Sequence, residues 1–236
     1  MAKQVDEFLM EKRRRIGRVI GGLLLIQMVG LTAGFIMLKP GVGPDFLTQA
    51  TGLESQIRVA VLLLLANAGI ALAIGVSSYA TFTNYSSPFA IALVAIATGW
   101  VLMRLVDSVH ILSMLSLSQR FAEHDGAKSD LYNLLADSLR STRNLAHYGE
   151  LLVIDVWFGL FYGALFLFRL VPRLLALFGL LAVALHLVGL PLAMFLGYPT
   201  ILPLAYGIGL SYLLIGGWLV AKGLPAGQSL KEIVGV

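Results

Sequence analysis

Six long apolar runs dominate the chain, and short polar segments separate them. A run of about 20 mostly apolar residues can cross the hydrocarbon core of a bilayer as an α-helix. The runs are continuous rather than alternating, so they do not match the period-two pattern of a membrane β-barrel. The expected spans are residues 16–38, 57–77, 88–112, 148–168, 171–195 and 201–221.

The segments between the runs are of two kinds. Four are short and rich in turn-forming residues, at 39–44, 84–88, 169–173 and 197–199. The fifth, residues 119–146, is longer. Ser129 is a plausible N-cap there, and leucines recur near a 3.6-residue period at Leu131, Leu134, Leu135 and Leu139. This pattern predicts an amphipathic helix that either lies on the membrane or continues into the fourth span.

Composition agrees with a membrane environment. Of 236 residues, 58% are hydrophobic and 13% are charged, and the mean hydropathy is +0.86. Soluble proteins have about 25% charged residues, so water-soluble enzyme classes are excluded. There is no cysteine, which excludes disulfides, thiolate metal sites and cysteine nucleophiles.

We expect an all-α integral membrane protein, a six-transmembrane-helix bundle with an amphipathic extramembrane helix between spans 3 and 4. Residues 1–15 form a basic N-terminal segment, 16–224 the transmembrane domain and 225–236 a tail.

The net charge of +4 comes from basic residues that gather beside the first span, at Lys12, Arg13, Arg14, Arg15 and Arg18. A span follows them directly, so they indicate a membrane flank and not a nucleic-acid partner. With the N-terminus in the cytoplasm, ten Lys and Arg lie on that side and six on the other. The positive-inside rule therefore predicts that both termini are cytoplasmic and that residues 119–146 lie outside.

Ionisable residues inside predicted spans are rare and suggest function. At about 1.5 Å per residue, four helices deliver polar side chains to one layer in the outer half of the membrane. These are Arg104, Asp155, His186 and Tyr206, with Asp107 just above the layer and Asn67 nearer the midplane. We expect Arg104 to pair with Asp155, or otherwise with Asp107. The cluster either lines a ligand cavity or only holds helices together.

Two short motifs suggest a metal site. Asp107 and His110 are three residues apart in the third span, and His147 and Glu150 are three apart at the start of the fourth. Paired carboxylates and imidazoles on facing helices hold metals in some bundles. Zinc, iron or manganese would suit these ligands; otherwise no cofactor is expected. In the alternative interpretation, His147 and Glu150 are solvated or capping residues at the membrane rim. No complete catalytic motif is present.

Three stretches resemble an uncharacterised bacterial membrane family, catalogued as domain of unknown function 4386. They are Arg104-Leu105-Val106-Asp107, the segment from Gly159 to Phe168 with Arg169-Leu170-Val171-Pro172-Arg173, and Ile215-Gly216-Gly217-Trp218-Leu219-Val220-Ala221-Lys222-Gly223. The resemblance extends from about Arg14 to Leu224. It implies a shared fold and a place in a bacterial cytoplasmic membrane.

These observations favour a non-enzymatic role. We expect binding, sensing or passage of a small or lipidic ligand in a polar-lined cavity in the outer half of the bundle, or action as a membrane scaffold subunit. The alternative is a metal-dependent, hydrolase-like intramembrane enzyme that uses Asp107, His110, His147 and Glu150. Expected partners are membrane lipids, such a ligand, and a second copy or a membrane complex, but not nucleic acid.

Overall fold

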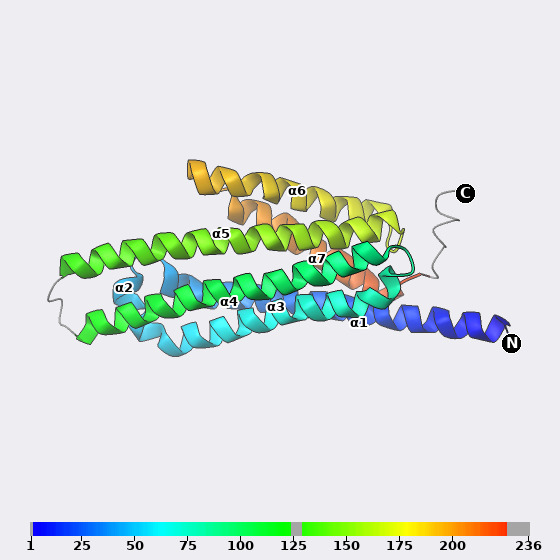
Figure 1. Cartoon of the computed structure of the whole chain (residues 1–236), viewed down its shortest axis with the longest axis horizontal. Helices are drawn as coiled ribbons and strands as arrows, with labels where there is room; N and C mark the ends of the chain where they lie inside the picture. The colour runs from blue at the N-terminus through cyan, green and yellow to red at the C-terminus, as the bar shows by residue number, and fades with distance from the viewer. Residues whose placement is uncertain (1, 124–128, 226–236) are drawn as a thin grey trace. The chain divides into compact units, whose positions relative to one another are not determined.

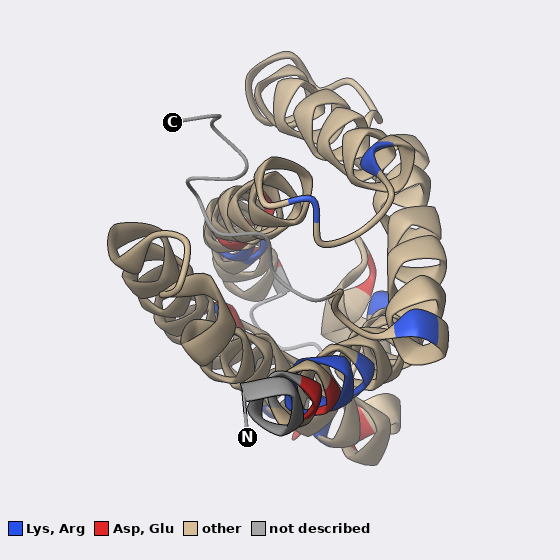
Figure 2. Ribbon diagram, turned by 90° about the vertical axis from the view of Figure 1, so that its right-hand side faces the viewer, with Lys and Arg blue, Asp and Glu red and all other residues tan. Residues whose placement is uncertain are grey.

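The computed structural model describes residues 2–123 and 129–225, in which every regular element is a helix (Figure 1). Six helices are long and apolar enough to cross a membrane, which confirms the predicted all-α, six-span class. They are α1 (Ala2–Leu38), α3 (Glu54–Phe82), α4 (Ser87–Glu123), α5 (Ser129–Leu167), α6 (Arg173–Leu196) and α7 (Ile201–Lys222). Most of the ribbon is uncharged (Figure 2), as expected for a chain that faces lipid. The protein is therefore a multi-pass membrane protein.

Helices α1, α3, α4 and α5 begin well before the predicted spans or end well after them. Helix α5 begins at Ser129 and continues without a break to Leu167, so the amphipathic segment and the fourth span are one element. This matches the second of the two expected arrangements. The first connection is also more structured than a simple turn, because it contains η1 (Lys39–Val42), α2 (Phe46–Gln49) and η2 (Thr51–Leu53). Residues 226–236 of the expected tail lie outside the described residues.

The chain divides into two compact units, which we describe separately. The first unit contains residues 1–28, 70–99 and 152–236, and the second contains 29–69 and 100–151.

The second unit has an apolar core that includes Phe46, Ile57, Leu64 and Met114, each at most 1% exposed. Ser118 of α4 fastens the connection between α1 and α3 to this core. Its hydroxyl donates to the carbonyl of Leu47 over 2.9 Å, and the Thr51 amide donates to it over 3.0 Å. These bonds satisfy polar groups that would be costly to leave unpaired in an apolar interior.

The first unit relies on small residues and aromatic rings. Helices α6 and α7 lie side by side (Figure 1). A Cβ atom added to Gly207 of α7 would lie 3.3 Å from that of Ala182 of α6, so the two backbones approach closely. Tyr162 of α5 and Ser211 of α7 share a hydrogen bond of 2.7 Å. Helix α6 ends at Leu196, and Gly197 caps it with a φ of +70°, a left-handed conformation that glycine adopts readily.

Candidate functional site

Two helices of the second unit carry polar side chains at the same spacing. They are Trp100, Arg104 and Asp107 on α4, and Arg143, His147 and Glu150 on α5. Steps of four and then three residues keep each set on one helix face. The faces meet in antiparallel register, since Trp100 bonds to Glu150 and Asp107 bonds to Arg143. We call these six residues the charge network.

Arg104 lies between the two carboxylates of the charge network. Its Nη1 donates to Asp107 Oδ2 over 2.9 Å, and its Nη2 lies 2.6 Å from Glu150 Oε1. Arg143 Nε donates to Asp107 Oδ1 over 3.0 Å, so both oxygens of Asp107 are paired. Trp100 Nε1 donates to Glu150 Oε1 over 3.1 Å. One guanidinium therefore joins a carboxylate on its own helix to a carboxylate on the next.

The charges of the network balance. Two guanidinium groups face two carboxylates, and the side chains of Arg104, Asp107 and Glu150 are at most 1% exposed. Removing a charged side chain from water costs free energy, and an oppositely charged neighbour with good hydrogen bonds offsets this cost. The network thus satisfies the main requirement for burying four charged groups inside a membrane helix bundle.

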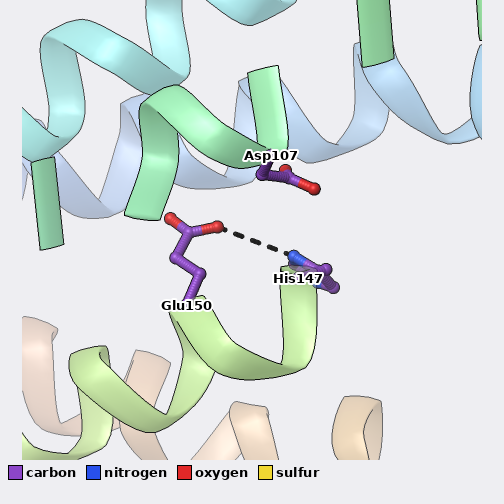
Figure 3. A group of neighbouring side chains, drawn as sticks. All are labelled: Asp107, His147 and Glu150. Carbon is purple, nitrogen blue, oxygen red and sulfur yellow. Dashed lines mark ion pairs between the residues drawn. The ribbon is translucent and has the colours of Figure 1, made fainter. Parts of the chain in front are cut away.

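One oxygen of Glu150 differs from the other carboxylate oxygens of the network. Glu150 Oε2 is fully buried and accepts no hydrogen bond from any described residue. Its neighbour is His147 Nδ1, 3.7 Å away, which also makes no hydrogen bond with the described residues (Figure 3). This distance exceeds that of a direct hydrogen bond. Phe35 of α1 packs edge-on against the His147 ring and lies 5.8 Å from the Arg104 guanidinium. Glu150 Oε2 is therefore the carboxylate oxygen of the network that is free to accept a hydrogen bond from a further donor.

The structure brings together three of the four predicted metal ligands. Ligand atoms of Asp107, His147 and Glu150 all lie within 4.8 Å of one another. His110 is not part of this group, and its Nδ1 bonds to the Val106 carbonyl of its own helix over 2.8 Å. The expectation that Glu150 is solvated at the rim was wrong. Glu150 is fully buried because α5 directs it toward α4, and depth along the span did not reveal that direction.

The other predicted residues do not join the charge network. Asp155 was expected to pair with Arg104, but it pairs with His186 in the first unit, where His186 Nδ1 lies 2.8 Å from Asp155 Oδ2. The alternative partner, Asp107, does contact Arg104, together with Glu150, which was not expected to do so. Asn67 is buried and donates to the Leu63 carbonyl over 3.2 Å. Tyr206 is 69% exposed on α7 and therefore does not line an interior site of the first unit.

Sequence reasoning missed Trp100 and Arg143. A tryptophan within a span is usually a core residue or a membrane-interface anchor, so Trp100 did not suggest a site. Arg143 lay in the segment that was expected outside the membrane. The signal that would have found them is the shared spacing of the two helices. Counting back three and seven residues from Glu150 along its face reaches His147 and Arg143. The same count from Asp107 reaches Arg104 and Trp100.

A family model described as "Domain of unknown function (DUF4386)" matches residues 19–223. The chain belongs to this family. The match runs from within α1 to the residue after α7 and includes the charge network. The predicted resemblance is confirmed, over a range that begins about five residues later and ends one residue earlier than expected. No curated protein and no solved structure matches the chain.

Proposed function

We propose that this member of the DUF4386 family binds a small or lipidic ligand at the charge network without catalysing a reaction. The observation that carries the proposal is the buried oxygen Glu150 Oε2, which faces His147 Nδ1 across 3.7 Å with no hydrogen bond from the described residues. A buried carboxylate oxygen without a donor is costly, so a ligand that donates to it gains the free energy of that hydrogen bond.

The charge balance limits the ligand's chemistry. Both carboxylates already have guanidinium partners, so an anion would add an uncompensated charge to a buried site. A hydroxyl, or an amine in its neutral form, can donate to Glu150 Oε2 and remain near His147 Nδ1 without that penalty. Phe35 offers an apolar ring beside these atoms. The ligand class is therefore a lipid or small amphiphile with a hydroxyl or amine group.

We place the protein in a bacterial cytoplasmic membrane with both termini in the cytoplasm. The family resemblance supports the bacterial membrane, and the distribution of ten basic residues against six supports the orientation.

A matched pair of histidine variants tests the binding proposal. His147→Gln changes the residue that faces Glu150 Oε2 but strands no formal charge, whereas His110→Gln makes the same change outside the charge network. The measurement is mass spectrometry of organic extracts of the purified proteins, together with melting temperature in detergent. We expect the wild-type protein and His110→Gln to retain a hydroxyl- or amine-bearing compound that His147→Gln loses.

The opposite result would support a scaffold role. If the wild-type protein carries no such compound above the level of an unrelated membrane protein, the network only holds α4 and α5 together. Equal retention in both histidine variants would exclude His147 from ligand contact and would overturn the proposed position of the ligand.

The second candidate is a metal-dependent, hydrolase-like enzyme. It is favoured by the close approach of Asp107, His147 and Glu150, which offer two carboxylates and an imidazole. Arg104 opposes it, because a divalent cation at these atoms would lie beside the guanidinium that already neutralises both carboxylates. The test is metal content and melting temperature with added zinc or manganese. A stoichiometric metal, with a metal-induced rise in melting temperature that Glu150→Ala abolishes and Asp155→Ala does not, would favour the enzyme.

A further inference from the structure

A hollow of about 230 Å³ lies in the first unit, where the start of the α1 apolar run meets the end of α3. It is lined by Lys12, Arg13 and Ile16 of α1 and by Ala80, Thr81 and Asn84 from the end of α3 and the turn after it. None of these residues belongs to the charge network. Two cations, an amide and a hydroxyl thus converge on one small concave surface at the ends of two membrane-spanning helices.

No carboxylate is among the residues that line this hollow. Figure 2 shows Lys and Arg positions on α1 behind the N-terminus, with Asp and Glu positions of the same helix among them. Among the residues that the structure describes, no carboxylate lies within ion-pair distance of Lys12 or Arg13. Burial raises the pKa of the neighbouring Tyr85 hydroxyl, and the Arg13 guanidinium only partly opposes this shift. Tyr85 therefore stays neutral at physiological pH and does not cancel the charge of Arg13.

Apolar side chains continue from the hollow along both helices. On α1, Val19 lies seven residues beyond Lys12 on the same face and is 49% exposed. On α3, Val76 lies four residues before Ala80 on the same face and is 58% exposed. The basic hollow and the exposed apolar faces beside it have the polarity of a phospholipid, with a charged headgroup at the membrane surface and acyl chains along the spans.

We propose that this hollow binds the headgroup phosphate of an anionic phospholipid. Lys12 and Arg13 contact the phosphate, and Asn84 and Thr81 offer further hydrogen bonds. The acyl chains lie along the faces that carry Val19 and Val76. Basic pockets between transmembrane helices at the cytoplasmic surface are suited to such headgroups. Free phosphate has the same anionic chemistry but would make no use of the apolar faces. This site is independent of the ligand proposed for the charge network.

The test is native mass spectrometry of the detergent-purified protein titrated with phosphatidylglycerol, phosphatidylcholine or inorganic phosphate. We expect the wild-type protein to bind phosphatidylglycerol in preference to the other two. The double variant Lys12→Gln/Arg13→Gln should bind it about 30-fold more weakly, a factor that corresponds to about 1 kcal/mol for each basic residue. Ala80→Trp, which fills the hollow without changing its charge, should lose binding as well.

The matched control is Arg14→Gln/Arg15→Gln, which removes the same charge from the same helix at residues that do not line the hollow. Its affinity should stay within about threefold of wild type, because Arg14 and Arg15 do not line the hollow and so do not contact the phosphate directly. Equal losses in the two double variants would overturn the proposal in favour of general electrostatic attraction. Competition by inorganic phosphate at the concentration that phosphatidylglycerol requires would overturn the lipid as the occupant.

Discussion

Arg104 of α4 and Glu150 of α5 form an ion pair of 2.6 Å in which the two side chains are 1% and 0% exposed. In water such a pair is worth little, but in a buried site each partner makes the other's desolvation tolerable. Within the second unit, the packing of α4 against α5 therefore depends on both Arg104 and Glu150. It also leaves Glu150 Oε2 directed at His147, which is the feature on which the proposed ligand site depends.

Removing Arg104 should be severely destabilising. Arg104→Met leaves Glu150 without its guanidinium partner and Asp107 with only one, so we expect the free energy of unfolding to fall by about 3–5 kcal/mol. Arg58→Met is the matched control, because the Arg58 side chain is 61% exposed in its ion pair with Glu54. Its effect should be about 0–1 kcal/mol. Melting in detergent measures both changes, and equal melting temperatures would contradict the structural role of the network.

The buried pair of Asp155 and His186 should behave as a unit. Asp155→Leu alone strands a buried imidazole, and His186→Leu alone strands a buried carboxylate, so each should destabilise by about 1–3 kcal/mol or more. The double variant should be less destabilised than the sum of the two, by about 0.5–3 kcal/mol. A double-mutant cycle on denaturant or thermal unfolding gives this coupling directly. Additive effects would mean that the two side chains do not stabilise one another.

Two adjacent glycines of α1 should respond oppositely to alanine. A Cβ atom at Gly21 would lie 2.7 Å from the carbonyl oxygen of Gly216 in α7, whereas at Gly22 it would meet nothing within 4 Å. Gly21→Ala must push α1 from α7, so the melting temperature should fall. Gly22→Ala should be neutral or stabilising, because alanine has a higher helix propensity than glycine by about 1 kcal/mol. If both variants melt alike, α1 and α7 do not pack through Gly21.

The orientation can be tested with single cysteines, because the chain contains none. If both termini are cytoplasmic, a cysteine at Gly126 should react with a membrane-impermeant maleimide in intact cells. A cysteine at Ser87 should react only after the membrane is opened. Ser87 is exposed at the start of α4 and does not line the proposed lipid hollow, so the lack of labelling in intact cells would not result from burial or from a bound lipid. The reverse pattern would invert the orientation and place the lipid hollow on the outer surface.

The apolar runs were sufficient to predict the fold class. A membrane-spanning segment must satisfy its own backbone hydrogen bonds, so a run of about 20 apolar residues allows only a helix. Length and composition thus determined six spans, and the motifs from Arg104 to Gly223 indicated the family. Local periodicity also placed Asp107 and His110 on one helix and His147 and Glu150 on another. It did not show that His110 would bond to the Val106 carbonyl of its own helix.

Partner choice across helices was decided only by the tertiary structure. Glu150 and Asp155 are five residues apart on α5, which directs them about 140° apart around the helix, and either could have faced Arg104. The rotation of α5 and its register along α4 made Glu150 the partner and left Asp155 to His186. In soluble proteins an apolar stripe reveals such a rotation, but lipid-facing helices are apolar on both their buried and their exposed sides. The sequence by itself therefore determined which segments are helices in a membrane, and the packing of those helices determined which charges meet.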